Sequence, residues 1–291
     1  MNDDFLEGLM TDHAALAKAA AEISSRYRER KGSLALQNET EALAYAAARM
    51  PATMAAVDHV LAQAHIPAPA SILDFGAGPG TATIAAKSLW PDARAAMIET
   101  NAHMRALSQK LVPGAAHVSS PAPADLVIAA YVLNELPDPV ATALSLWYAA
   151  QSHLVLIDTG TPETSRMMLS VRDALIRAGA HIHAPCPHHL ECPFTRADDG
   201  WCHFSVRLAR TRLHRQLKGA DLGYEDEKFM YLVAGRAPAP AIDARIIGYP
   251  RVGKVVQLPL CRSDGHLETA QISKRDARYK GAKKAKWGDA L

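Results

Sequence analysis

Short apolar segments alternate with longer amphipathic segments through the middle of the chain. Buried strands are predicted at 71–75, 93–99, 125–133 and 153–159, and the segments between them have helical spacing. Strands that are apolar on both faces and alternate with helices are typical of a parallel sheet covered by helices on both sides. The pattern therefore predicts an α/β fold of the Rossmann-like kind.

The two ends of the chain have different patterns from the middle. Residues 1–68 are rich in Ala, Leu and Glu and predict a helical N-terminal extension, in which Pro51 begins a further helix. Residues 69–236 form the predicted α/β domain, interrupted at 181–203 by an insertion rich in His, Cys and Pro. Residues 237–291 predict a small β-rich C-terminal extension that ends in a basic tail.

Composition excludes several classes of protein. The 291 residues are 49% hydrophobic and 21% charged, as in soluble globular proteins. No apolar run reaches the roughly 18 residues that span a bilayer, so no membrane association is expected. The acidic start, MNDDFLEGLM, does not resemble a secretory signal. We therefore expect a cytoplasmic location, a reducing compartment in which clustered cysteines more often bind metal than form disulfides.

Charge is distributed unevenly along the chain. The net formal charge is +2, but the half up to residue 150 carries −5 and the half from residue 151 carries +7. The basic residues gather at 207–218 and 274–286, and the second group is interleaved with Tyr279 and Trp287. Basic side chains bind phosphates and aromatic side chains stack on unpaired bases. The C-terminal half is therefore the predicted contact for a polyanion such as RNA.

A glycine-rich turn follows the first predicted strand and opens a helix. It includes Asp74, Gly76, Gly78 and Gly80, and Glu99 lies 23 residues after Gly76 at the end of the next strand. Such a turn brings backbone N–H groups close to a ligand. The spacing resembles motif I of class I S-adenosylmethionine (SAM) dependent methyltransferases. That resemblance implies that Asp74 and the three glycines surround the methionine part of SAM and that Glu99 binds its ribose. The alternative is a turn without a ligand.

The segment after the third predicted strand supplies the catalytic candidates. Enzymes that methylate amines of nucleic acids often carry an (Asp/Asn)-Pro-Pro-(aromatic) motif here, whereas this chain has Asn134-Glu135-Leu136-Pro137. Asn134 and Glu135 either hold the methyl acceptor or cap the helix that follows. The sequence leaves both interpretations open.

The four cysteines lie in the C-terminal half. They are Cys186, Cys192, Cys202 and Cys261, separated by 5, 9 and 58 residues. Structural zinc sites usually contain C-x2–4-C pairs, which are absent here. Two of the cysteines precede proline, and four thiolates are the usual complement of a [4Fe–4S] cluster. A cluster is therefore one candidate occupant. A zinc site that includes nearby histidines and inert core cysteines are the alternatives.

Motifs along nearly the whole chain resemble the mitochondrial small ribosomal subunit methyltransferase-like assembly factors and their bacterial relatives. The matching stretches are AYAAARMPATMAA (44–56), ILDFGAGPGTA (72–82), LVLIDTGTP (154–162), CPHHLECP (186–193), WCHFSVRLAR (201–210), HRQLKGADLGYEDEKFMYLV (214–233) and KKAKWGD (283–289). The resemblance implies a class I methyltransferase fold that binds SAM and holds a [4Fe–4S] cluster on all four cysteines. It also implies action on the small ribosomal subunit and its rRNA, in mitochondria for a eukaryotic relative.

Three functions are compatible with these observations. The first is a SAM-dependent methyltransferase that modifies rRNA or another component of the assembling subunit. The second is a non-catalytic assembly factor, in which SAM and the cluster are structural ligands that stabilise an RNA-binding conformation. The third is a small-molecule methyltransferase, which leaves the cysteines and the basic tail without a role. A monomer is sufficient for each of them.

Overall fold

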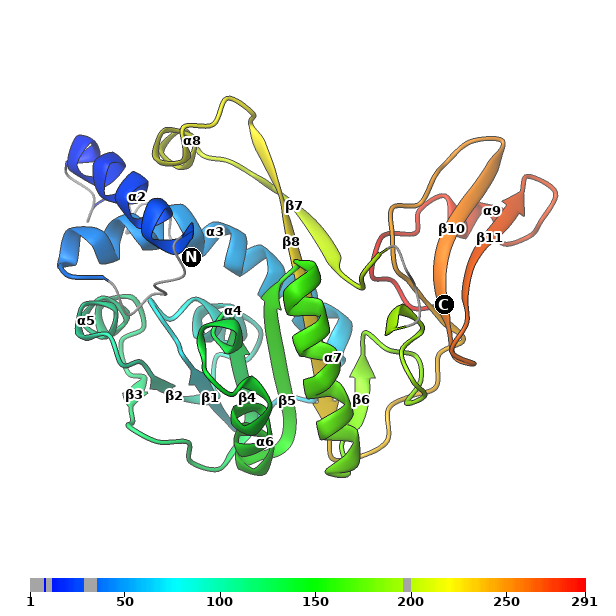
Figure 1. Ribbon diagram of the computed structural model, residues 1–291, viewed down its shortest axis with the longest axis horizontal. Coiled ribbons are helices and arrows are strands. Elements are labelled where there is room, and N and C mark those ends of the chain that lie inside the picture. The colour runs from blue at the N-terminus through cyan, green and yellow to red at the C-terminus, as the bar shows by residue number, and fades with distance from the viewer. Residues whose placement is uncertain (1–7, 9–11, 29–35, 196–199) are drawn as a thin grey trace.

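The computed structural model describes residues 8, 12–28, 36–195 and 200–291, and an eight-stranded sheet forms its centre (Figure 1). The strand order is β3-β2-β1-β4-β5-β8-β6, and β7 pairs with β8. The strands are β1 (Ser71–Phe75), β2 (Arg94–Ile98), β3 (Ala116–His117), β4 (Ala124–Ala130), β5 (Ala150–Thr159), β6 (His181–Ala184), β7 (Phe204–Ala209) and β8 (Tyr224–Gly235). All are parallel except at β8, which runs antiparallel to β5, β6 and β7. This is the class I methyltransferase arrangement, so the predicted fold class is confirmed.

Helices cover both faces of this sheet. One face is covered by α3, α4 and α5, of which α3 contacts the other two, and the other face by the adjacent helices α6 and α7 (Figure 1). The helices are α2 (His13–Arg28), α3 (Glu39–Ala64), α4 (Thr81–Leu89), α5 (Ala102–Leu111), α6 (Pro139–Ala149), α7 (Pro162–Arg177), α8 (Arg212–Lys218) and α9 (Tyr279–Ala282), with 3-10 turns η2 (Leu133–Glu135) and η3 (Pro193–Thr195). In the described part of the chain, no helix is long and apolar enough to cross a membrane.

Helix α3 is continuous through Pro51, so the prediction that Pro51 begins a further helix is wrong. An internal proline removes one backbone hydrogen bond and costs about 3 kcal/mol. Met50, Ala52 and Val57 on either side of it are almost fully buried. Burial of this apolar stripe against the sheet offsets the local cost, because tertiary packing supplies most of the stability of helices in proteins.

The main core lies between the central strands and the helices on both faces. Phe204, Phe229 and Tyr231 form one aromatic group on β7 and β8, and Trp147 on α6 fills the opposite face. A second core joins the N-terminal helices α2 and α3 to α5 and α8. The projecting α8, which connects β7 to β8, is thereby anchored to the N-terminal extension.

A second sheet of three antiparallel strands occupies the C-terminal extension. Its strands are β9 (Ala244–Ile246), β10 (Val255–Arg262) and β11 (Leu267–Ser273). The last residues return to this sheet, where Ala290 bridges Arg245 and the Leu291 N–H donates to the Ala244 carbonyl at 2.9 Å. The end of the chain, predicted as a basic tail, is therefore packed against β9, and its Trp287 is only 8% exposed.

Candidate functional site

The glycine-rich turn connects β1 to α4 at the carboxyl edge of the parallel strands. Gly76, Gly78 and Gly80 all have positive φ angles, between 54° and 88°, which only glycine adopts at little cost. A Cβ atom on Gly76 would lie 2.5 Å from a methyl carbon of Val132, and one on Gly80 would lie 2.7 Å from a methyl carbon of Val112. A Cβ on Gly78 would meet nothing within 4 Å. The turn is therefore tightly packed at two glycines and open to a ligand at the third.

Asp74, the last core-facing residue before the turn, is only 1% exposed. Its Oδ2 accepts hydrogen bonds from the Thr83 hydroxyl at 2.7 Å and the Thr83 N–H at 3.0 Å, while its Oδ1 has no hydrogen-bond partner. Burial raises the pKa of Asp74 to about 6, with Glu99 adding a smaller effect in the same direction. A buried carboxylate oxygen without a partner is costly, so Asp74 favours a ligand that brings a donor or a positive charge.

Glu99 at the end of β2 holds the turn in place. Its Oε2 accepts from the Gly78 N–H and its Oε1 from the Asn101 N–H, both at 2.7 Å. Burial raises the pKa of Glu99, although these backbone hydrogen bonds oppose that shift. Each carboxylate oxygen has two acceptor lone pairs, so Glu99 retains acceptor capacity toward the pocket.

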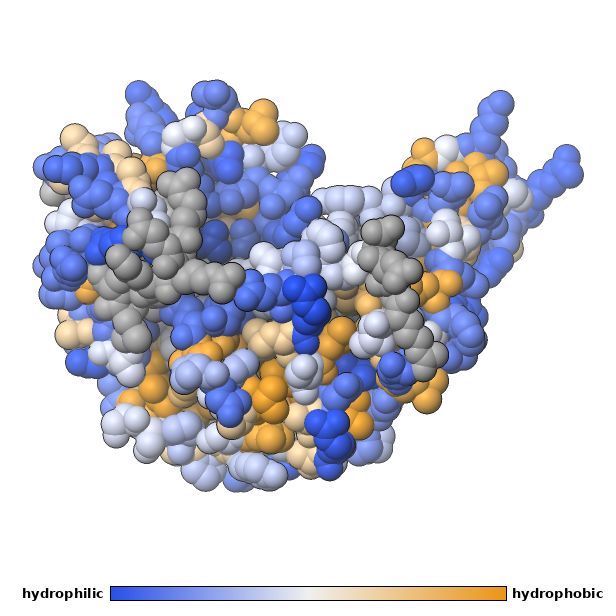
Figure 2. Space-filling model, in the orientation of Figure 1, coloured by the Kyte–Doolittle hydropathy of each residue, from blue (hydrophilic) through white to orange (hydrophobic). Residues whose placement is uncertain are grey.

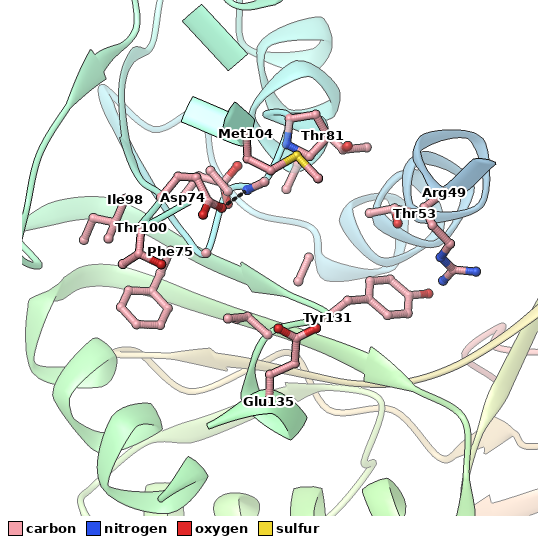
Figure 3. Close-up of a pocket in the computed structure, with 18 of the residues that line it drawn as sticks. Arg49, Thr53, Asp74, Phe75, Thr81, Ile98, Thr100, Met104, Tyr131 and Glu135 are labelled. Atoms are coloured by element: carbon pink, nitrogen blue, oxygen red, sulfur yellow. Dashed lines mark hydrogen bonds between the residues drawn. The ribbon is translucent and has the colours of Figure 1, made fainter. Parts of the chain in front are cut away.

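A cavity of about 250 Å³ lies in front of the turn (Figure 3). Among the predicted site residues, those that line it are Asp74, Gly76, Gly78, Glu99 and Glu135. Figure 3 shows the Glu135 carboxylate pointing into the pocket, across from Asp74. Neither Gly80 nor Asn134 lines the cavity. The structure thus brings five of the seven predicted pocket residues around one space.

The loop after β4 fixes where Glu135 lies. The Asn134 N–H donates to Oδ2 of Asp158, a fully buried residue on β5, at 3.0 Å. Burial raises the pKa of Asp158 to about 7. Asp138 caps α6, accepting from the Ala141 N–H. Capping of that helix by Asn134 or Glu135, one of the two sequence interpretations, is therefore wrong.

An ion pair that sequence reasoning missed closes one side of the pocket. Glu227 on β8 accepts from Nη2 of Arg49 on α3 at 3.1 Å and from the Tyr131 hydroxyl at 2.9 Å. Tyr131 has φ of +58°, a strained backbone for a residue with a side chain. One signal was available, because Arg49 is the single basic residue in the segment that forms α3.

The four cysteines come from separate parts of the structure. Cys186 follows β6, Cys192 precedes η3, Cys202 precedes β7, and Cys261 lies on β10 of the second sheet. None is in a disulfide, and all but the half-buried Cys186 are 9% exposed. Burial raises the pKa of Cys192 to about 11 and that of Cys261 to about 12.

These thiols also influence one another. Burial raises the pKa of Cys202 well above its usual value, and charges on the other three cysteines raise it further, so all four lie within electrostatic reach. In the ranges that the structure describes, no three His, Cys, Asp or Glu side chains are grouped to hold a single metal ion. Within these ranges, the arrangement shows neither a zinc site nor the predicted cluster.

Unpaired polar atoms surround the cysteines. Nε of Arg172, the Tyr231 hydroxyl and Nδ1 of His188 are buried without hydrogen-bond partners. Nε2 of His188 lies 3.5 Å from Sγ of Cys261. Burial raises the pKa of Tyr231, and charges on Cys202 and Cys186 act in the same direction. The unpaired donors of Arg172 and Tyr231 beside the thiols favour an occupant that offers acceptors.

The basic groups at 207–218 and 274–286 differ in how far acidic partners neutralise their charge. Arg207 forms a bidentate pair with Asp226, while Arg210 and Lys218 both bind Glu225. The C-terminal extension, residues 237–291, contains 11 basic and 5 acidic residues and so has a net charge of +6. Stacking of a base on Trp287 is not compatible with its burial, because its ring already packs against Tyr249 and His203.

Comparison with known proteins gives one curated relative and several structures. The human mitochondrial ribosome assembly protein METTL17 is 29% identical over an alignment of 292 positions, which covers 86% of this chain and 62% of the relative. The chain thus spans less than two thirds of that protein's length. The magnesium protoporphyrin IX methyltransferase of Synechocystis, solved with bound SAM, aligns with a TM-score of 0.42 at 16% identity, covering 73% of this chain and 90% of its own.

A second structure is the precorrin-6y C5,15-methyltransferase of Geobacter metallireducens, with a TM-score of 0.40 at 16% identity. It covers 62% of this chain and 87% of its own. The family described as mitochondrial small ribosomal subunit Rsm22 matches residues 39–291, from the start of α3 to the end of the chain. That match includes the pocket, all four cysteines and the second sheet, and the chain therefore belongs to the Rsm22 family of the mitochondrial small ribosomal subunit.

Proposed function

We propose that this protein is a SAM-binding, methyltransferase-like assembly factor of the small ribosomal subunit that carries a [4Fe–4S] cluster. The observation that carries the SAM part is Asp74, a buried carboxylate with an unpaired oxygen beside the glycine turn. Membership of the Rsm22 family supports the ribosomal part, as does the name of the human relative, a ribosome assembly protein.

Each pocket residue fits a part of SAM. The unpaired Oδ1 of Asp74 suits the ammonium group of the methionine part, because a cation would offset the cost of the buried carboxylate. Gly78 leaves room for the ligand beside the turn. Glu99, held by two backbone N–H groups, presents its remaining acceptor positions to the ribose hydroxyls. SAM supplies an electrophilic methyl group when it is bound.

If methyl transfer occurs, Glu135 is the residue that we expect to hold the acceptor. Its carboxylate points into the pocket (Figure 3), and catalysis of this kind depends mainly on positioning the nucleophile. Asn134 acts indirectly, because its N–H ties the loop to Asp158. We assign Asn134 a positioning role only.

A non-catalytic assembly factor is the second candidate, and the pocket wall favours it. Arg49, Tyr131 and Glu227 close one side of the pocket with a hydrogen-bonded ion pair. A wall built this way restricts the entry of a large acceptor such as a nucleobase. SAM would then stabilise the folded state by mass action without donating its methyl group.

The four cysteines fit an iron–sulfur cluster better than a single ion. A cluster carries its thiolate ligands farther apart than one metal ion does, which agrees with four thiols that influence one another without forming a single-ion group. Its sulfurs are hydrogen-bond acceptors that match the unpaired donors of Arg172 and Tyr231. Cys186, Cys192, Cys202 and Cys261 would hold it.

The C-terminal extension is the part that we expect to contact rRNA. In Figure 2 the lobe formed by β10, β11 and α9 is mostly hydrophilic and projects from the body of the protein. Its net charge of +6 contrasts with +2 for the whole chain. We expect the protein to act as a monomer wherever small subunits are assembled, in the cytoplasm of a bacterium or, as the relative's name says of that protein, in mitochondria.

One experiment distinguishes a methyltransferase from a non-catalytic assembly factor. Immature small subunits are incubated with radiolabelled SAM and the wild-type protein or the Glu99→Ala variant. Label transferred by the wild type and lost with the variant supports the methyltransferase. Stoichiometric subunit binding and measurable SAM binding without transfer support the assembly factor. A protein that binds neither SAM nor the subunit contradicts both.

Salt dependence tests the rRNA surface. Replacing the exposed Lys283 and Lys284 with alanine should lower the slope of log affinity against log salt by about 0.9 for each phosphate that the variant no longer neutralises. Arg207→Ala is the matched control, because Asp226 already neutralises that arginine. If the two changes lower the salt slope equally, the C-terminal extension is not the surface that contacts rRNA.

A further inference from the structure

Helix α7 carries one arginine that differs from its neighbours. Arg166 and Arg177 are exposed, whereas Arg172 is 0% exposed. Burying a guanidinium without compensation costs several kcal/mol. Its carboxylate partner, Asp173, is 2.9 Å from Nη1, but the side chain of Asp173 is itself 48% exposed. The ion pair with Asp173 therefore satisfies only the Nη1 end of the buried guanidinium.

The rest of the guanidinium faces the cysteine loop. Nη2 of Arg172 donates to the carbonyls of His188 and Leu190, both at 2.9 Å. Both carbonyls lie between Cys186 and Cys192, so one side chain fixes the course of the loop that presents two of the four thiols. Nε of Arg172 has no partner although it is buried. That donor is available to an acceptor beside the cysteine loop.

Electrostatics agree with this geometry. Burial acts to lower the pKa of Arg172, but the charge and hydrogen bonding of Cys186 outweigh it, with smaller effects from Asp173 and Cys192, and the pKa is raised. In the other direction, Arg172 opposes the burial that raises the pKa values of Cys192, Cys202 and Cys261. The guanidinium is therefore within electrostatic reach of all four thiols.

We propose that Arg172 is the charge-compensating residue of the four-cysteine site, fixing the Cys186–Cys192 loop and offering its Nε–H to a sulfur of the occupant. The inference rests on the cluster of the proposed function and adds a residue that tunes it. Four thiolates bring more negative charge than the iron–sulfur core neutralises, and net charge and hydrogen bonds to sulfur set the reduction potential of such clusters. Lysine cannot replace arginine fully, because it lacks the planar fork that reaches two carbonyls and a third acceptor.

The experiment compares anaerobically purified wild type with Arg172→Met, Arg172→Lys and the exposed control Arg177→Met. Iron and acid-labile sulfide are measured first, followed by the reduction potential and the rate of iron loss to a chelator. For Arg172→Met we expect about tenfold faster iron loss. We also expect at least a tenfold lower ratio of reduced to oxidised cluster at a fixed potential, a downward shift of about 59 mV for one electron. Arg172→Lys should lie between, and Arg177→Met should match the wild type.

The outcomes distinguish this inference from the function on which it rests. A wild type without iron and sulfide overturns the cluster and Arg172's role with it. A loaded wild type whose Arg172→Met variant matches Arg177→Met in potential and iron loss overturns the role of Arg172 alone. If circular dichroism shows that Arg172→Met does not fold, Arg172→Lys decides: an unchanged potential and rate of iron loss in that folded variant overturns the inference.

Discussion

The glycine-turn pocket and the four-cysteine site are assembled in different ways. Asp74, the glycines and Glu99 belong to one continuous strand–helix–strand unit, β1-α4-β2. The cysteines are spread from residue 186 to residue 261 and across two separate sheets. The glycine turn with its two acidic residues therefore depends on one local unit, whereas the cysteine site forms only when the C-terminal extension docks on the α/β domain.

The two sites also suit ligands of different charge. Asp74, Glu99 and Glu135 line the pocket, which suits a ligand that carries positive charge. Arg172 and the unpaired Tyr231 hydroxyl surround the cysteines, which suits an occupant with acceptor sulfurs. We propose that these are two independent cofactor sites in one chain, and the following changes test that independence.

The largest effect is expected from Cys261→Ser. Removing the thiolate that the second sheet contributes should remove most of the about four iron atoms that a [4Fe–4S] cluster holds. It should also expose the linker 237–243 to protease, because the proposed cluster would join β10 to the α/β domain through Cys261. SAM affinity should stay within about twofold, since distant sites are usually energetically independent. Ser263→Ala, an exposed neighbour, is the control. Full iron content in Cys261→Ser would exclude this cysteine as a ligand.

Glu99→Ala should have the opposite effects to Cys261→Ser, weakening SAM binding and leaving the iron content unchanged. The change removes the acceptor for the Gly78 N–H and for the ligand, and we expect SAM to bind about 10- to 100-fold more weakly, or roughly 1.4–2.8 kcal/mol. Iron content should not change. Titration calorimetry measures the affinity, with Asp92→Ala at the opposite edge of the sheet as the control. Equal losses in both variants would show that Glu99 has no specific role.

Asp158 predicts an unusual dependence of stability on pH. Its folded pKa of about 7 lies above its ordinary value of 3.8, so the folded state binds more protons than the unfolded state between these values. The stability contributed by its protonated form is complete below pH 4 and lost as pH rises through 7. In urea unfolding, the free energy of unfolding of Asp158→Asn should change less with pH over this window than that of the wild type, by about 4 kcal/mol. If plots of the free energy of unfolding against pH are parallel for the two proteins, the pKa of Asp158 is not raised.

The smallest effect concerns the wall between the N-terminal extension and the pocket. A double-mutant cycle of Arg49→Met and Glu227→Gln should give a coupling free energy of about 1 kcal/mol in urea unfolding, because Arg49 is partly exposed and its charge is partly screened. Glutamine retains an acceptor for the Tyr131 hydroxyl, so the cycle reports the ion pair. Strict additivity would show that the pair contributes nothing to the wall.

Local pattern was sufficient for the strands and for the glycine turn. The predicted strands at 71–75 and 93–99 correspond to β1 and β2 within a residue or two, and positive φ at Gly76, Gly78 and Gly80 follows from their spacing. Pattern failed at Pro51, where local preference predicts a break and burial of the flanking residues maintains the helix.

Contacts between residues that are far apart in the chain could not be predicted from the sequence. Arg49 and Glu227 are 178 positions apart. No local signal in the acidic segment at 225–227 distinguishes Glu227, which binds this pocket-lining arginine, from Glu225 and Asp226, which pair with basic residues between 207 and 218. Trp287 lies in a basic segment whose pattern predicts exposure, yet it is buried by the return of the chain to β9.

The sequence by itself determined the α/β fold, the glycine turn with its two acidic partners, the uneven charge and the set of four cysteines. Each depends on residue type and short-range spacing, which backbone sterics and strand–helix periodicity translate directly into structure. Tertiary structure alone decided which side chains share a space: Glu135 in the pocket and Asn134 outside it, Glu227 at the pocket wall, and Arg172 beside the cysteines. Burial and long-range pairing are properties of the folded chain, because a side chain's neighbours exist only after distant segments have packed together.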